Sequence, residues 1–137
     1  MKAVYPVIFT QTENVILAEV PDLEILTEGK EIAEAITMAR DAIGLKVISM
    51  EDDGMELPNP TDLLKIDVEK GTFAAEGISY VSIVDVDTTE YRKKMENKSV
   101  RRNITLPNWL NLEAEKAHIN VSKVAQEALM EKLGVSK

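Results

Sequence analysis

The chain contains no cysteine and no long apolar run. Without cysteine it forms neither disulfides nor thiolate metal sites, a composition that is usual in the cytosol. No apolar stretch approaches the ~20 residues that a membrane-spanning helix requires, so we expect no membrane association. The N-terminal segment has one lysine, Lys2, and no small-residue cleavage site, so it does not resemble a signal peptide. These absences predict a cytoplasmic protein.

Groups that could carry catalysis are also scarce. His118 is the only histidine, and Gly54 and Gly71 stand alone, so neither a catalytic dyad nor a phosphate-binding glycine loop is indicated. Asp85 and Asp87 lie two apart in an expected strand, so they share a face and leave a metal-dependent nuclease as one hypothesis. Because spacing places no other acid beside them, we expect no enzyme, no metal site and no cofactor.

The charge is divided unevenly along the chain. Residues 1–98 hold 10 Lys and Arg against 20 Asp and Glu, a net charge of −10. Residues 99–137 hold 6 against 4, a net charge of +2. The acidic part would repel nucleic acid and attract a basic protein, unless its acids serve only solubility. The C-terminal part could approach a phosphate backbone.

The N-terminal part predicts an α+β fold, in which an antiparallel sheet carries one packed helix. β-branched and aromatic residues predict strands over 4–10 and 15–20, joined as a hairpin by a polar turn. Apolar residues at helical spacing predict a helix over 29–43, capped by Thr27 or Glu28 and stopped by Gly44. Two further strands are predicted over Leu63–Val68 and Gly77–Val86.

Composition divides the chain into three segments. Residues 1–87 form the acidic α+β domain, and residues 88–99 are polar and highly charged, as in a linker. Residues 100–137 have a different pattern, which predicts a strand, a helix, a turn and a second helix. Asn120 is placed to cap that second helix and Gly134 to stop it.

The strand predicted over residues 100–106 has no partner within its own segment. A lone strand leaves backbone N–H and C=O groups unpaired, and so short a segment rarely sustains a core. Both problems are solved if two copies pair their strands about a two-fold axis, giving a homodimer or a higher even oligomer. The predicted dimer core consists of Ile104, Leu106, Trp109, Leu110, Val124, Ala128 and Leu129.

The other side of the same strand suits DNA. Alternation places Arg101, Asn103 and Thr105 on one face, and a two-stranded ribbon fits the major groove of B-DNA. Arg pairs with guanine, Asn with adenine, and Thr bonds a base edge or contacts a thymine methyl. The alternative is that this face is only solvated, which does not explain why it lacks Asp and Glu.

The segments RRNITLP, HINVSK and VAQEAL, in that order, resemble the ribbon-helix-helix repressors. The resemblance covers about residues 100–133 and implies a dimerisation module that binds operator double-stranded DNA. It also implies that the amides around Asn120, Val121 and Ser122 hold a DNA phosphate. A helix N-terminus has the free N–H groups and partial positive charge for that role.

The whole chain resembles the HicB antitoxins. The similar segments are the opening strand pair, EGKEIAEAITMARDAIGL, ELPNPTDL, SYVSIVDVD and the ribbon segment. One departure is PDLEILTEG, where the family often has a Pro-Gly-Cys-like turn. The resemblance implies a reduced RNase H-like N-terminal domain, a HicA-like basic ribonuclease toxin as partner, and repression of the protein's own operon. The alternative is a ribbon-helix-helix repressor whose N-terminal domain senses a small ligand.

Overall fold

The computed structural model describes residues 1–96 and 99–136, and the chain forms two compact units, residues 1–98 and 99–137. We call them the N-terminal and C-terminal units and describe each by itself. Within the described ranges, no helix combines the length and apolar character needed to cross a membrane.

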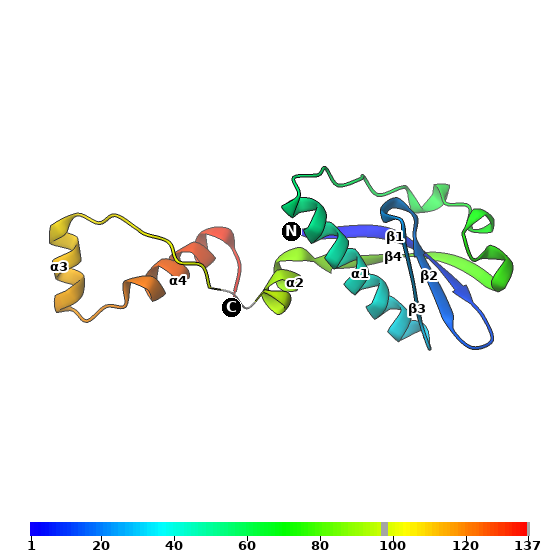
Figure 1. Ribbon diagram of the computed structural model, residues 1–137, viewed down its shortest axis with the longest axis horizontal. Coiled ribbons are helices and arrows are strands. Elements are labelled where there is room, and N and C mark those ends of the chain that lie inside the picture. The colour runs from blue at the N-terminus through cyan, green and yellow to red at the C-terminus, as the bar shows by residue number, and fades with distance from the viewer. Residues whose placement is uncertain (97–98, 137) are drawn as a thin grey trace. The chain divides into compact units, whose positions relative to one another are not determined.

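The N-terminal unit is built on a four-stranded antiparallel sheet, as expected for the α+β class (Figure 1). Its strands are β1 (Lys2–Gln11), β2 (Ile16–Val20), β3 (Ile25–Gly29) and β4 (Ile78–Asp87), in the order β3-β2-β1-β4. The predicted β1–β2 hairpin is confirmed, and the Thr12 amide closes its turn by donating to the Val15 carbonyl at 3.0 Å. The RNase H-like relationship of this sheet stays a prediction.

Strand β3 was not predicted. After β2, a short 3₁₀ turn over Pro21–Leu23 leads to Glu24, which has a left-handed φ of 55°. That conformation reverses the chain, so that β3 pairs antiparallel with β2. The sequence signal was weak because the exposed residues of β3, Leu26 and Glu28, do not alternate between apolar and polar types.

Helix α1 (Ile32–Asp52) is longer than predicted, and both predicted ends were wrong. The cap is Glu31, whose carboxylate accepts from the amides of Ala33 and Glu34 at 3.0 and 2.8 Å. Gly44 does not stop the helix but lies buried inside it. A Cβ atom at Gly44 would come within 2.9 Å of the Tyr91 ring, so the glycine provides space for an aromatic side chain of the next helix.

The predicted strand over Leu63–Val68 was also wrong. The segment forms two 3₁₀ turns, Leu63–Lys65 and Val68–Lys70. The carboxylate of the residue before each turn, Asp62 or Asp67, accepts from the backbone amide two residues on, at 3.0 Å in both cases. Such local side-chain bonds compete with strand pairing, and they favour turns here.

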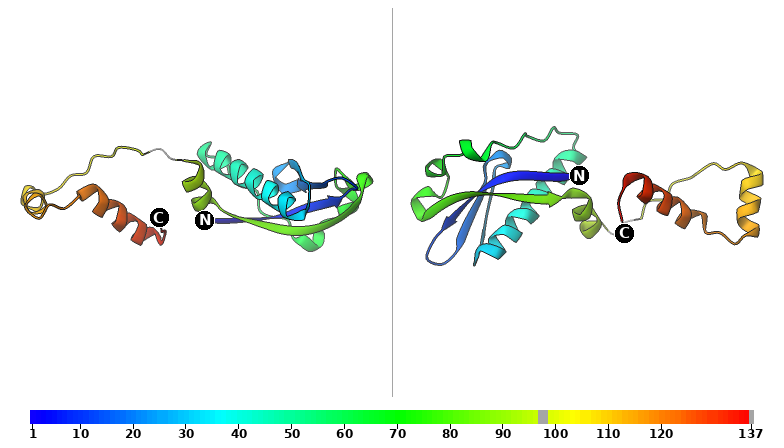
Figure 2. Two further views of the ribbon diagram at one scale, coloured as in Figure 1. Left: turned by 90° about the horizontal axis from the view of Figure 1, so that it is seen from below. Right: turned by 180° about the vertical axis from the view of Figure 1, so that it is seen from behind.

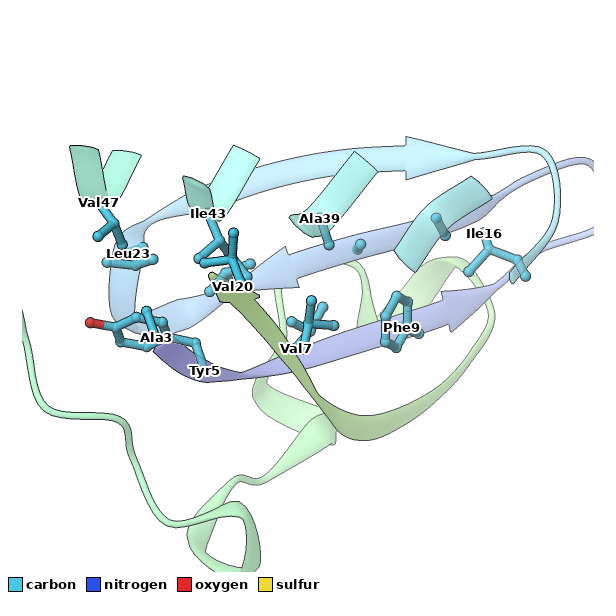
Figure 3. Packing of buried hydrophobic residues seen from close by; sticks show 14 residues of the cluster. Ala3, Tyr5, Val7, Phe9, Ile16, Val20, Leu23, Ala39, Ile43 and Val47 are labelled. Atoms are coloured by element: carbon cyan, nitrogen blue, oxygen red, sulfur yellow. The ribbon is translucent and has the colours of Figure 1, made fainter. Parts of the chain in front are cut away.

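The hydrophobic core lies between the sheet and α1 (Figures 2 and 3). Alternate residues of β1 point toward the helix, and Phe9 and Val7 are fully buried among them. The Tyr5 hydroxyl lies at the border of this core and donates to the Pro58 carbonyl at 2.7 Å. Burial raises the pKa of Tyr5, and the nearby negative charge of Asp22 raises it further. The core residues are Ala3, Tyr5, Val7, Phe9, Ile16, Ala18, Val20, Leu23, Ala35, Ala39, Ile43, Val47, Val84 and Val86.

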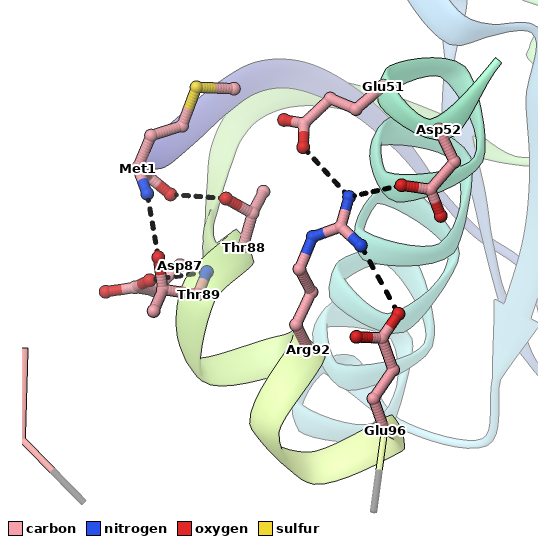
Figure 4. A network of polar contacts seen from close by, with 8 residues as sticks. All are labelled: Met1, Glu51, Asp52, Asp87, Thr88, Thr89, Arg92 and Glu96. Atoms are coloured by element: carbon pink, nitrogen blue, oxygen red, sulfur yellow. Dashed lines mark hydrogen bonds and ion pairs between the residues drawn. The ribbon is translucent and has the colours of Figure 1, made fainter. Parts of the chain in front are cut away.

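The charged segment expected to be a linker begins with helix α2 (Thr88–Met95), which packs on the N-terminal unit. Arg92 holds it there through Asp52 at 2.8 Å and Glu51 at 3.1 Å, both at the C-terminal end of α1 (Figure 4). A third ion pair joins Arg92 to Glu96 at 3.3 Å. The hydrogen bonds that Arg92 donates to Asp52 and Glu51 raise the pKa of Arg92 above its usual range.

We expect Ile43→Ala to lower the free energy of unfolding by about 2–5 kcal/mol, because the truncation leaves a cavity in a fully buried site. Leu45→Ala is the matched control, since Leu45 lies on the same helix but is exposed. Its effect should stay within about 0.5 kcal/mol. Urea unfolding followed by circular dichroism measures both, and equal midpoints for the two variants would contradict the assigned core.

Candidate nucleic-acid interface

The C-terminal unit contains an extended segment and two helices. Residues 99–107 form neither helix nor strand, and they lead into α3 (Asn108–Lys116) and α4 (Val121–Leu133). The predicted limits of α4 are confirmed. The Asn120 side chain caps it by accepting from the Lys123 amide at 3.1 Å, and Gly134 ends it with a φ of 68°. The strand predicted over residues 100–106 has no neighbour in a single chain and stays a prediction.

The turn between α3 and α4 is fixed by backbone hydrogen bonds. The His118 amide donates to the Glu115 carbonyl at 3.1 Å, and the Ile119 amide donates to the Ala114 carbonyl at 3.0 Å. Together these two hydrogen bonds form a motif that commonly ends helices. His118 takes the left-handed position of this motif with a φ of 56°, where glycine is usual. These contacts restrict the backbone of the turn and fix the position of Asn120 at the start of α4.

The start of α4 has the geometry of an anion site. The first intrahelical bond runs from the Val124 amide to the Asn120 carbonyl at 3.1 Å. The Asn120 side chain already binds the Lys123 amide. The amides of Val121 and Ser122 lie in the first turn and have no carbonyl partner within the helix, so they can donate to an external ligand. Their role in holding a phosphate stays a prediction, because no ligand is bound.

The predicted base-reading residues lie in the extended segment. Arg101, Asn103 and Thr105 are all exposed, and none forms a hydrogen bond or ion pair with another described residue. Their alternation with Arg102 and Ile104 puts them on one side of the segment if it is a strand. Three free polar side chains on one side are what a groove-reading surface requires.

Apolar side chains of this unit lack a cover. None of its described residues is buried, and Trp109, Leu129 and Leu133 are 66%, 61% and 72% exposed. Of the predicted dimer core, Leu106 is half-buried while Ile104, Trp109, Leu110, Val124, Ala128 and Leu129 are exposed. Ile119 in the turn is also exposed and was not predicted, because a single turn residue has no periodicity to mark it.

One hollow brings three elements of the unit together. Ile104 and Leu106 of the extended segment, Asn108 and Asn111 of α3 and Val121 of α4 line a space of about 350 Å³. Most of the lining side chains are exposed. The lining combines apolar side chains with two asparagine amides, so the hollow offers both apolar contact and hydrogen bonds to another molecule.

The two acids considered for nuclease chemistry have structural contacts instead. The Asp85 carboxylate pairs with Arg40 at 3.3 Å. The Asp87 carboxylate caps α2 by accepting from the amides of Thr89 at 3.0 Å and Glu90 at 3.2 Å. Among the described residues, no three His, Cys, Asp or Glu side chains converge as metal ligands.

Two solved structures share this architecture over nearly the whole chain. A structure described as a toxin–antitoxin complex from Streptococcus pneumoniae contains a chain with 24% identity and a TM-score of 0.61, over 96% of this chain and 99% of that one. The crystal structure of the Burkholderia pseudomallei antitoxin HicB matches with 21% identity and a TM-score of 0.50, over 98% of each chain. The fold is therefore one found in proteins of toxin–antitoxin systems.

The family of the protein is identified from its sequence. Residues 5–132 match the family described as HicB-like antitoxin of bacterial toxin–antitoxin system. Because the match spans most of the chain, the protein belongs to the HicB-like antitoxins, and the resemblance found in the sequence is confirmed. A search of curated proteins gave no significant match.

We expect Asn120→Ala to destabilise the C-terminal unit by roughly 0.5–2 kcal/mol, because the Lys123 amide loses its acceptor. Gln126→Ala, at an exposed position inside the same helix, is the control and should change little. Thermal unfolding at one fixed protein concentration measures both variants. An unchanged melting temperature for Asn120→Ala would show that the cap does not stabilise α4.

Proposed function

We propose that this protein is an antitoxin that neutralises a HicA-like ribonuclease toxin and represses its own operon in the cytoplasm. Residues 1–87 bind the toxin, residues 88–99 join the two activities, and residues 100–137 dimerise as a ribbon-helix-helix module on operator DNA. No catalysis and no cofactor is needed for either activity.

The observation that carries this proposal is the uncovered apolar surface of the C-terminal unit. Burying apolar surface stabilises by roughly 25 cal/mol per Å², so covering several large exposed side chains would strongly favour association. Two copies pairing residues 100–106 antiparallel would satisfy the backbone of the extended segment and cover Ile104, Trp109 and Leu129. The same pairing would present Arg101 and Asn103 twice, as a palindromic operator requires.

The charges of the two units support assigning toxin binding to the N-terminal unit and DNA binding to the C-terminal unit. The N-terminal unit has a net charge of −10, which complements a basic toxin and disfavours contact with DNA. The C-terminal unit has a net charge of +2. Membership of the HicB-like antitoxins and the fold shared with a toxin–antitoxin complex support a toxin as the partner.

The toxin-binding part can be tested with a chain shortened after Lys98. The hydrophobic core of the N-terminal unit is complete without residues 99–137, so the shortened chain should fold. We expect it to inhibit RNA cleavage by the small basic toxin encoded beside its gene as well as the full chain does. It should no longer retard operator DNA in gel-shift assays. A folded shortened chain that fails to inhibit cleavage would contradict the proposed division.

For the DNA-binding part, we expect Asn103→Ala to weaken operator binding by roughly 1–3 kcal/mol and to relax sequence preference. Glu127→Ala, exposed on α4, is the control. Fluorescence anisotropy with operator and scrambled duplexes at one salt concentration separates the two effects. An equal loss on both duplexes would exclude base reading by Asn103.

A further inference from the structure

A groove lies beside the C-terminal half of α1 in the N-terminal unit. It is lined by residues of the turn 21–24, of the end of α1 and of the loop 55–58, and its volume is about 370 Å³. We call it the α1 groove. Ligand pockets usually measure ~300–1,000 Å³, so this groove is a small one. Because most of its lining residues are at least partly exposed, it is open to a side chain of another protein.

The bottom of the α1 groove is apolar. Leu23 lines it as a member of the hydrophobic core and is 3% exposed (Figure 3). Met50 packs partly buried against the same core, and Met55 is 56% exposed. Methionine side chains are unbranched and adapt to the shape of an inserted group. The groove is therefore suited to an occupant with an apolar stem.

Hydrogen bonds hold two walls of the groove in place. The Asp22 carboxylate accepts from the amide and the hydroxyl of Thr61, at 2.9 and 2.6 Å. The Tyr5 hydroxyl donates to the Pro58 carbonyl at 2.7 Å. These bonds join the turn 21–24 and the sheet to the loop that follows α1. A groove with walls already fixed loses little conformational freedom when it is filled.

The charged residues of the groove are mainly acidic. Glu24 and Asp53 are exposed, and neither carboxylate has a hydrogen bond or ion pair with another described residue. Asp22 is the third acid, and Lys46 is the only cation among the lining residues. Three negative charges against one positive charge leave a net charge of −2. The C-terminal end of α1 adds the negative end of the helix dipole.

Glu24 also has an unusual backbone conformation. Its φ of 55° lies in the left-handed region, which disfavours every residue that has a Cβ atom. No contact of its carboxylate within the described chain offsets that cost. Strained residues of this kind are frequent where a protein holds a ligand. Glu24 is therefore better explained by an external partner than by the fold.

We propose that the α1 groove binds one arginine or lysine side chain of the toxin. The aliphatic stem packs on Met50 and Met55. The cationic head donates hydrogen bonds to the free carboxylates of Glu24 and Asp53, which are the specificity-determining residues of the groove. A toxin with a neutral or acidic residue at this point would leave both carboxylates without a partner. This inference rests on the proposed function, because its occupant belongs to the basic toxin proposed there.

Other occupants fit the groove less well. An acidic side chain would meet a net charge of −2. A metal ion is not favoured either, since no three His, Cys, Asp or Glu side chains of the described residues converge as ligands. A cationic side chain with an apolar stem matches both the acids and the methionines.

The test is the affinity of the full chain for the small basic toxin encoded beside its gene, measured by isothermal titration calorimetry. Glu24→Gln should weaken binding roughly tenfold, the usual loss when a hydrogen bond between charged groups is removed. The loss should shrink as the salt concentration rises. Glu28→Gln makes the same change of charge at an exposed position outside the groove, and this matched control should bind like the native chain.

Lys46→Gln reports the sign of the charge on the occupant. Removal of the only cation in the groove should strengthen the binding of a basic side chain several-fold. Lys30→Gln, exposed and outside the groove, is the control for the change in net charge. Weaker binding by Lys46→Gln, together with stronger binding by Glu24→Gln, would overturn the proposal in favour of an acidic occupant.

Glu24→Gly separates binding from folding. Glycine adopts the left-handed region without strain, so the melting temperature should stay the same or rise while the toxin affinity falls as in Glu24→Gln. A lower melting temperature with unchanged toxin affinity would show that Glu24 serves only the fold.

These measurements distinguish the groove from the proposed function. If the native chain, Glu24→Gln and Glu28→Gln all bind the toxin equally, the groove proposal is overturned and toxin binding stands. A native chain that does not bind the toxin would overturn the proposed function, and this inference with it.

Discussion

The C-terminal unit cannot bury its own apolar side chains. It has two helices, of which α4 is capped by Asn120, and an extended segment, yet none of its described residues is buried. Because apolar burial is the main favourable term in folding, the proposed dimer would supply most of the stability of such a unit. On this proposal, folding and association would be linked to the geometry of the proposed DNA-reading face, so operator binding would depend on protein concentration as well as on affinity.

The N-terminal unit has the opposite character. Its core is complete within one chain, and the ion pairs of Arg92 with Glu51 and Asp52 hold α2 against α1 (Figure 4). An antitoxin built this way would keep a toxin-binding surface that is folded at any concentration.

The sequence predicted the elements whose signals are local. The hairpin turn, the Asn120 cap and the Gly134 stop depend on residues close in the chain, and all three are confirmed. Of the errors, one depends on a distant residue and another on local side-chain bonds that were overlooked. Gly44 lies inside α1 and leaves room for the ring of Tyr91, 47 residues away. Residues 63–68 form turns, in which the carboxylates of Asp62 and Asp67 accept from nearby backbone amides.

Sequence alone determined the division into an acidic and a basic part and the apolar stripe of α4, because composition and periodicity are properties of the chain itself. The shared face of Arg101, Asn103 and Thr105 stays a prediction from the alternation of residues 100–106. Only the tertiary structure decided that the C-terminal stripe is uncovered, that Asp85 and Asp87 serve structural contacts, and that β4 has an open edge. Burial and strand order depend on which residues meet in space, and no local pattern specifies that.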